Sequence, residues 1–125
     1  MGRSVLAVIA GLVATVVLST ACDAVMMAAV PGAFEHGPSP AMMAFGVCYT
    51  LLAATAGGFI AALIARRAEL MHALVLGTLG AISTLVIIIA APATQRTVAM
   101  LVSGMLVIPA TVLGGWMRRR TRPHP

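Results

Sequence analysis

The sequence predicts an all-α integral membrane protein, a four-helix antiparallel bundle with both termini in the cytoplasm. Three observations lead to this prediction. The 125-residue chain is 61% hydrophobic and only 9% charged, whereas soluble domains carry roughly 25% charged residues. Four apolar runs are each long enough to cross a bilayer. The basic residues gather on one side of the four crossings. The lipid bilayer is therefore the partner that this composition fits.

The first two predicted spans are bounded by clear breaks in the apolar pattern. The run 5–30 ends at the segment PGAFEHGPSP, and the run 41–65 ends at the basic turn RRAE. The prolines of the first break lie where a missing backbone N–H costs least. Because a backbone inside lipid must satisfy its own hydrogen bonds, each run is predicted to be helical.

The third and fourth predicted spans complete a single transmembrane domain over residues 1–125. The run 70–91 ends at PATQR, and the run 98–117 ends at RRRTRPHP. Both have about the 20 apolar residues that a helix needs to cross hydrocarbon. Pro109 lies inside the fourth run and predicts a kink there.

The arginines predict the orientation of the chain. All eight Lys and Arg residues are arginines, and seven of them fall on one side of the four crossings. The opposite side has only Arg96, together with Glu35 and His36. The positive-inside rule therefore places the termini and the RRAE turn in the cytoplasm, and no nucleic-acid partner is predicted. The seven topology residues are Arg3, Arg66, Arg67, Arg118, Arg119, Arg120 and Arg122.

Small residues at every fourth position predict helix packing in the second and third spans. Such ladders let two backbones approach closely in lipid, where no hydrophobic force draws helices together. The short turn between these spans suggests that the two ladders face each other. Their members are Gly46, Thr50, Ala54, Gly58 and Ala62 in the second span, and Ala73, Gly77 and Ala81 in the third.

The string GGFIAALIARRAELMHALVLG, residues 57–77, resembles a pattern in small four-helix bacterial inner-membrane proteins of uncharacterised role. In that pattern a Gly-Gly pair precedes a basic turn, and a His-Ala pair then opens the next span. The resemblance implies a multi-pass protein of the bacterial inner membrane. It implies no catalytic activity.

The sequence allows several interpretations of Cys22. The segment LSTAC resembles a lipoprotein signal, but Ser19 stands where that signal has a large aliphatic residue, and the apolar run continues to Val30. An uncleaved first span is therefore predicted. If the first two spans form a hairpin, Cys22 and Cys48 lie at similar depth near an oxidising compartment, which would permit a disulfide. The alternative is that both cysteines are small apolar residues.

A soft-metal site is a further alternative at the outer end of this hairpin. Thiolate, thioether and imidazole are the ligands that Cu(I) favours, but methionine is also a common space filler. No spaced ligand motif is present, so no metal or cofactor is predicted. The residues that such a copper site would use are Cys22, Met26, Met27, His36, Met42, Met43 and Cys48.

Asp23 is the one acidic residue inside a predicted span. An ionisable group within the membrane is costly and suggests function. Asp23 could be the site of a proton-linked carrier, as in small multidrug-resistance transporters, although the aromatic residues of their cavities are nearly absent here. The structural alternative is an ion pair between Asp23 and Arg96 that caps the outer end of the bundle.

The sequence contains no catalytic constellation: no nucleophile with a base, no paired carboxylates and no phosphate-binding loop. We therefore expect a non-enzymatic protein, a structural or accessory subunit that binds a membrane-protein partner or forms a homo-oligomer. The alternatives are a proton-linked small-molecule transporter that acts as a homodimer, and a periplasm-facing copper-binding protein.

Overall fold

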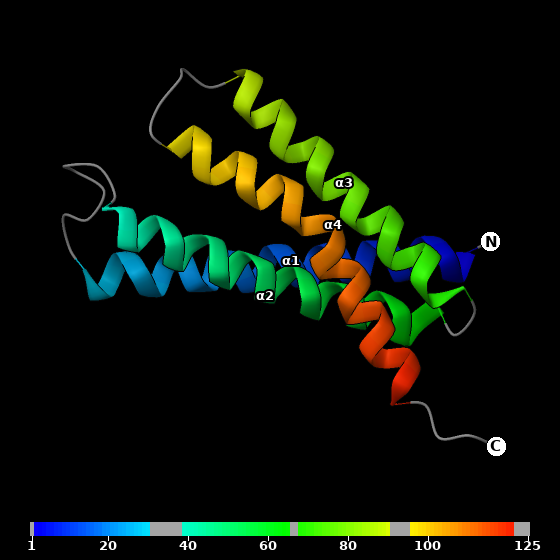
Figure 1. Ribbon diagram of the computed structural model, residues 1–125. Helices are drawn as coiled ribbons and strands as arrows, with labels where there is room; N and C mark the ends of the chain where they lie inside the picture. The colour runs from blue at the N-terminus through cyan, green and yellow to red at the C-terminus, as the bar shows by residue number, and fades with distance from the viewer. Residues whose placement is uncertain (1, 31–38, 66–67, 91–95, 122–125) are drawn as a thin grey trace.

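The structure is a computed structural model that describes residues 2–30, 39–65, 68–90 and 96–121, without the side chains of residues 2–3 and 96–97. Within these ranges the chain forms four helices and no strand (Figure 1): α1 (Gly2–Ala29), α2 (Pro40–Ala65), α3 (Glu69–Ala90) and α4 (Arg96–Arg120). All four are long and apolar enough to cross a membrane. Within the described residues, the all-α class and the four apolar helices are confirmed.

Several residues singled out from the sequence lie outside the described residues or have undescribed side chains. The first group is His36, Arg66, Arg67 and Arg122, and the second is Arg3 and Arg96.

Local interactions explain where two helices begin. Ser39 caps α2, since its carbonyl accepts a hydrogen bond from the Met43 N–H at 3.0 Å and its hydroxyl accepts one from the Met42 N–H at 3.3 Å. Pro40 follows in the first helical position, where a missing N–H costs nothing. At the start of α3, the Ala68 carbonyl accepts the His72 N–H at 3.2 Å.

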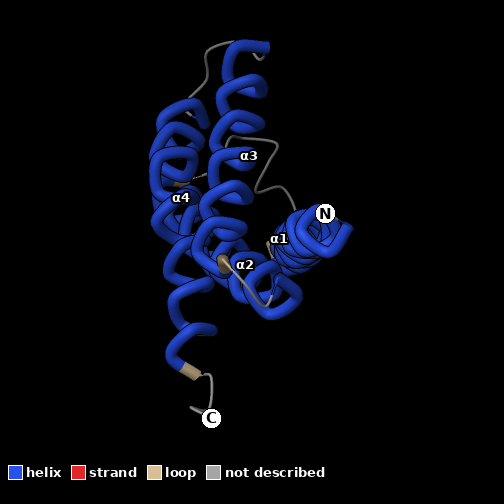
Figure 2. Tube along the Cα trace, turned by 90° about the vertical axis from the view of Figure 1, so that its right-hand side faces the viewer, coloured by secondary structure: helices blue, strands red, loops and turns tan. Residues whose placement is uncertain are grey.

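The helices do not contact one another equally. α4 packs against α2 and α3, and α1 packs mainly against α2. Figure 2 shows α1 and α4 on opposite sides of the molecule, and no backbone packing is found between the described residues of these two helices. α2 and α4 therefore form the centre of the fold, while α1 lies at its edge.

The closest packing lies where α4 crosses α2 and α3. A methyl group on Gly58 would clash with the backbone of Thr111, and one on Gly77 would clash with the Thr111 hydroxyl. The Thr111 side chain is 1% exposed. Five residues of the two small-residue ladders are buried: Ala54, Gly58, Ala62, Ala73 and Gly77.

The predicted partner of these ladders needs correction. Gly58 and Gly77 both lie against α4, and Gly115 of α4 lies against Ala73. Thr111 and the glycines of α4 fit between the second and third spans, so α4 and not the opposite ladder provides the close contact. Gly46 and Ala81 are only half-buried and lie beyond this crossing.

α4 changes direction in its middle, where Figure 1 draws it in deep orange. Pro109 lies inside this helix and has no N–H for the usual bond to the preceding turn. The Thr111 hydroxyl donates to the carbonyls of Val107 at 3.0 Å and Ile108 at 2.9 Å. The kink predicted from Pro109 therefore coincides with the crossing.

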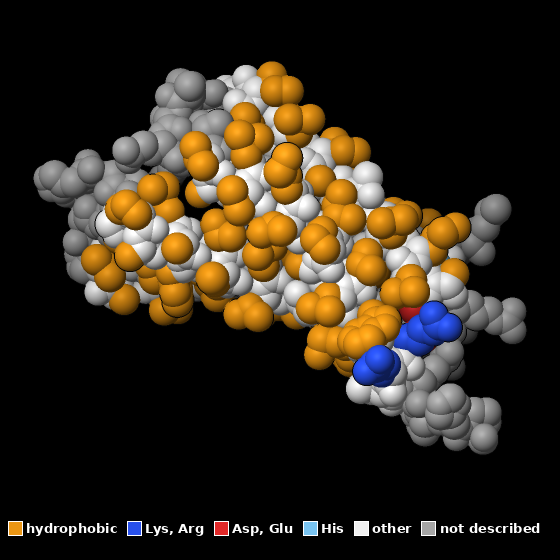
Figure 3. Space-filling view, viewed as in Figure 1, with side chains coloured by type: hydrophobic (Ala, Val, Ile, Leu, Met, Phe, Trp, Pro, Cys, Tyr) orange, Lys and Arg blue, Asp and Glu red, His pale blue; other side chains and the backbone are white. Residues whose placement is uncertain are grey.

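The face shown in Figure 3 is apolar over most of its length. Large side chains such as Ile89 and Leu52 are 77% and 71% exposed. The described arginines gather at one end, in the last turn of α4, where Arg120 lies 4.0 Å from the centre of the Trp116 ring. An apolar belt with a basic, aromatic end is the surface that a bilayer requires.

Candidate functional site

A cavity of about 370 Å³ lies between the four helices, at the end of the fold away from Arg118–Arg120. Every helix contributes to its walls. The lining residues are Asp23, Met26, Met42, Met43, Gly46, Val47, Tyr49, Thr50, Thr84, Ile87, Ala99, Met100 and Ser103. Among the side chains that the structure describes, Asp23 is the only charged one in this lining.

The position of the cavity follows from the crossing. The backbones are held together by Gly58, Gly77 and Thr111, and α1 meets α2 at Gly11 and Gly57. Beyond these contacts, Figure 1 shows the α1–α2 pair diverging from the α3–α4 pair. Side chains of medium size line the space that opens between the pairs, and they do not fill it.

Asp23 is held by Tyr49 across the α1–α2 interface. The Tyr49 hydroxyl donates a hydrogen bond to the Asp23 carboxylate. The Tyr49 ring in turn rests edge-on against Phe45, one helical turn earlier, with 5.7 Å between ring centres. This contact fixes the direction of the phenol, so the acid has a positioned donor while it still lines the cavity.

Two other hydroxyl groups in the lining donate their hydrogens to their own helices. Thr84 donates to the Gly80 carbonyl at 2.9 Å, and Ser103 donates to the Ala99 carbonyl at 2.9 Å. A hydroxyl oxygen keeps its lone pairs when its hydrogen is donated. Thr84 and Ser103 therefore present hydrogen-bond acceptors to the cavity.

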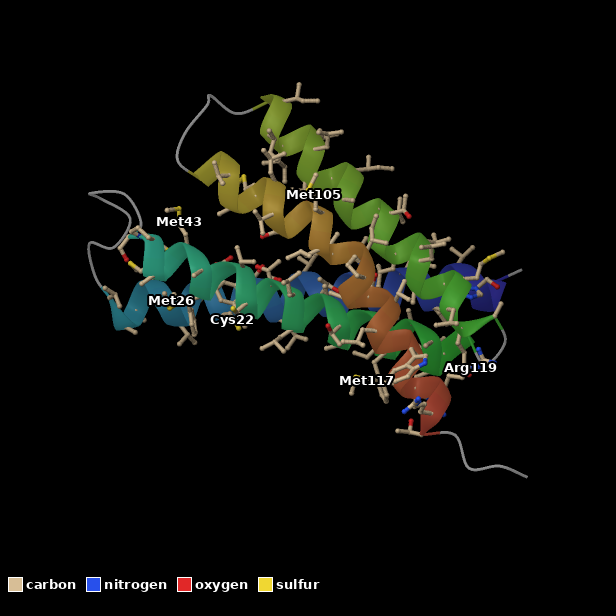
Figure 4. The ribbon with its side chains drawn as sticks, in the orientation of Figure 1. Cys22, Met26, Met43, Met105, Met117 and Arg119 are labelled. Atoms are coloured by element: carbon tan, nitrogen blue, oxygen red, sulfur yellow. The ribbon has the colours of Figure 1, made fainter. Side chains whose placement is uncertain are left out.

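The methionines divide into two groups. Met26, Met42, Met43 and Met100 line the cavity and are half-buried; Figure 4 labels Met26 on α1 and Met43 on α2. The other described methionines lie on the exterior and are 47–78% exposed: Met27, Met71, Met105 and Met117. The cavity thus has a thioether wall contributed by three helices.

The copper-site residues proposed from the sequence are only partly brought together. Met26, Met42 and Met43 share the cavity, but Met27, Cys22 and Cys48 are not in its lining. No group of three or more His, Cys, Asp or Glu side chains within the described ranges could hold a metal ion.

Cys22 and Cys48 are free cysteines in the structure, half-buried and exposed respectively. Asp23 and Tyr49 face each other across the interface, and the cysteine that precedes each is turned by about 100° around its helix. The disulfide stays a prediction for oxidation experiments. The ion pair of Asp23 with Arg96 also stays a prediction, because the Arg96 side chain is not described.

Tyr49 and Met100 were not anticipated as site residues. The sequence could have indicated Tyr49, because Asp23 and Tyr49 are equally far from His36 along the chain. In an antiparallel hairpin centred on His36, the two residues would lie at the same depth. Met100 has no such signal, since its position depends on how α4 lies across α2.

Together, the fold and the cavity define a four-helix membrane protein with a small, mainly apolar chamber between its helices. No family model, curated protein or solved structure matches the chain. The resemblance of residues 57–77 to small bacterial inner-membrane proteins stays a prediction.

Proposed function

We propose that this protein binds a small molecule in the cavity between its helix pairs and carries it across the bacterial inner membrane, with Asp23 as a proton-linked carrier site. One observation supports this function above the others: Asp23 lines a cavity of about 370 Å³. A carrier needs its acid to face such a space, whereas an acid that only stabilises the bundle does not.

The size and chemistry of the cavity support binding of a small molecule. Ligand pockets usually measure roughly 300–1,000 Å³ and combine an apolar wall with a few polar groups. Here the wall is built from methionines, Val47 and Ile87, and the polar groups are Asp23 and four hydroxyl residues. We infer a non-enzymatic, binding role from this combination of apolar wall and few polar groups.

We infer that the chain crosses the inner membrane as an antiparallel bundle with both termini in the cytoplasm. The arginines of the last turn of α4 lie at the end of the fold away from the cavity. Since cytoplasmic ends carry the excess of arginine, the cavity lies toward the periplasmic side. A homodimer would provide a second copy of the same chamber.

A structural or accessory subunit is the second candidate function. The hydrogen bond from Tyr49 to Asp23 favours it, because a positioned donor lowers the cost of a carboxylate within the membrane. In this role the protein would bind a membrane-protein partner or a second copy, and the cavity would hold only lipid chains or water.

Filling the cavity separates the two functions. A methyl group on Gly46 would come no closer than 3.9 Å to the Tyr49 ring, so Gly46→Leu occupies the chamber without a backbone clash. Ala44→Leu is the matched control, since Ala44 is an exposed residue of the same helix outside the lining. The probes are phenylbutanol, phenylbutylamine and phenylbutyrate, which share one apolar body.

A carrier should bind at least one of these probes, lose that binding in Gly46→Leu and keep it in Ala44→Leu, as measured by isothermal titration calorimetry in detergent. Counterflow of the bound probe in proteoliposomes then tests transport. If no probe binds the wild-type protein, or if Gly46→Leu binds as well as Ala44→Leu, the cavity is not a ligand site and the accessory role takes precedence.

A further inference from the structure

We infer that the ligand of this cavity is an organic ammonium ion that carries N–H donors: a protonated primary or secondary amine on an apolar body. This inference rests on the proposed function and specifies its substrate class. It follows from the charge, the hydrogen-bonding groups and the size of the chamber.

The charge of the lining favours a cation. Among the described lining side chains, Asp23 is the single formal charge, and the donor that these side chains offer to its carboxylate is the neutral Tyr49 hydroxyl. A carboxylate accepts several hydrogen bonds through its two oxygens. A positively charged ligand would therefore find both a counter-charge and a second carboxylate oxygen that can accept a hydrogen bond.

The hydroxyl groups favour a ligand that donates hydrogen bonds. Tyr49, Thr84 and Ser103 all donate their hydrogens within the protein. What remains toward the cavity is mainly acceptor lone pairs, supplemented by the Thr50 hydroxyl. An ammonium head with two or three N–H groups satisfies several acceptors at once, whereas a quaternary ammonium or a neutral ether satisfies none.

The rest of the wall fits an apolar body. Met26, Met42, Met43 and Met100 present unbranched thioethers, which adapt to ligand shape and are common at permissive binding surfaces. Their half-burial in the cavity contrasts with the 47–78% exposure of the other described methionines. These four side chains thus cover the part of the ligand that carries no charge.

The volume of the cavity favours an organic cation over a soft metal ion as the ligand. Thioethers also bind Cu(I) and Ag(I), but a coordinated ion needs its ligands within bonding distance on all sides. A chamber of about 370 Å³ is instead in the range of small organic ligands. Silver is therefore included in the test as the competing outcome.

The experiment compares three probes that differ only in the head group: phenylbutylamine, phenylbutanol and phenylbutyltrimethylammonium. Calorimetry on the purified full chain in detergent at neutral pH should show that the amine binds at least about tenfold more tightly than either other probe. Asp23→Asn should bring the amine to the affinity of the alcohol, and Ala44→Leu should leave all three affinities unchanged.

A second variant tests the inference independently if Asp23→Asn does not fold. Ser103→Ala removes one acceptor and no charge, and it should weaken the amine by a few-fold without affecting the alcohol. Free thiols bind silver by themselves, so silver is tested on a chain in which Cys22 and Cys48 are replaced by serine. In this chain silver nitrate should not displace the amine.

Each other outcome is decisive. If the alcohol binds and is lost in Gly46→Leu, but the amine is no tighter, the cavity is a ligand site and the ammonium inference is wrong. Equal binding of the quaternary probe would show that charge alone matters and that the N–H donors do not. Silver that displaces the amine would assign a soft-metal site. Absence of all binding would overturn the proposed function as well.

Discussion

Thr111 of α4 lies directly against Gly58 of α2, with no room for a methyl group between the two backbones. On its other side, the Thr111 hydroxyl lies against Gly77 of α3. One buried threonine therefore sets the spacing of three helices, and its neighbours must be glycines.

Replacement of Gly58 by alanine should destabilise the protein. The added Cβ meets backbone atoms of Thr111, which cannot rotate away as a side-chain tip can, so the helices must separate. Overpacking of this kind typically costs about 1–3 kcal/mol. The free energy of unfolding in mixed micelles, measured by denaturation with sodium dodecyl sulfate, should fall by this amount.

Two glycines outside the crossing provide the control for Gly58→Ala. A Cβ at Gly46 would have no contact closer than 3.9 Å, and one at Gly80 would make an ordinary 3.4 Å contact with Val107. Gly46→Ala and Gly80→Ala should each change the free energy of unfolding by less than about 0.5 kcal/mol. Equal effects at all three glycines would contradict the crossing.

Asp23 and Tyr49 should be energetically coupled. Tyr49→Phe removes the donor to the carboxylate, and Asp23→Ala removes both the charge and the acceptor. Because Asp23 is exposed and Tyr49 is half-buried, we expect a coupling of about 1 kcal/mol in a double-mutant cycle on the free energy of unfolding. Phe45→Leu, which removes the ring that supports Tyr49, should reduce this coupling. Additive single effects would show that the hydrogen bond contributes nothing.

The predicted topology can be tested with single cysteines in a chain whose native cysteines are replaced by serine. A cysteine at His36 should react with a membrane-impermeant maleimide added to intact spheroplasts. A cysteine at Thr121, an exposed residue just after α4, should react only after the membrane is opened, because the arginine-rich end lies inside. Labelling of Thr121→Cys in intact spheroplasts would place the C-terminus outside.

Oxidation tests the relation of Cys22 and Cys48. Because each is turned by about 100° from the Asp23–Tyr49 contact, and Cys48 is exposed, we expect copper–phenanthroline to link them slowly within one chain. A control pair, Asp23→Cys with Tyr49→Cys in the serine background, should form the bond faster, since these positions face each other. A faster native pair would mean that α1 is rotated relative to α2.

The four helices could be predicted from sequence because bilayer thickness and backbone hydrogen bonding constrain each run independently of its neighbours. The residues that suit close packing could also be predicted, since Gly58 and Gly77 are small wherever their partners lie. The helix that these two glycines contact could not be predicted. Thr111 has no local feature that marks it as the partner of both, and its position follows from the crossing of α4.

The candidate site shows the same division. Asp23 could be predicted as a site residue because it is an acid within an apolar run. Met26, Met42 and Met43 could be predicted because they lie near the connection between the first two helices. Met100 and Ser103 belong to a helix distant in sequence, so their approach to Asp23 depends on the splay of the helix pairs. That splay is a property of the whole packing and has no sequence motif.

Because the helices are in close contact where α4 crosses α2 and α3, a small rotation at this point produces a larger displacement at the cavity end of the fold. From Gly58 to Met42 along α2 is about 24 Å at 1.5 Å per residue, so a rotation of about 5° at the crossing would move the cavity end by about 2 Å. Helix tilt responds to the hydrophobic thickness of the surrounding bilayer. A slight tilt that leaves the Gly58–Thr111 contact intact would therefore widen or narrow the cavity around Asp23. A change in bilayer thickness would change the volume of the cavity in this way.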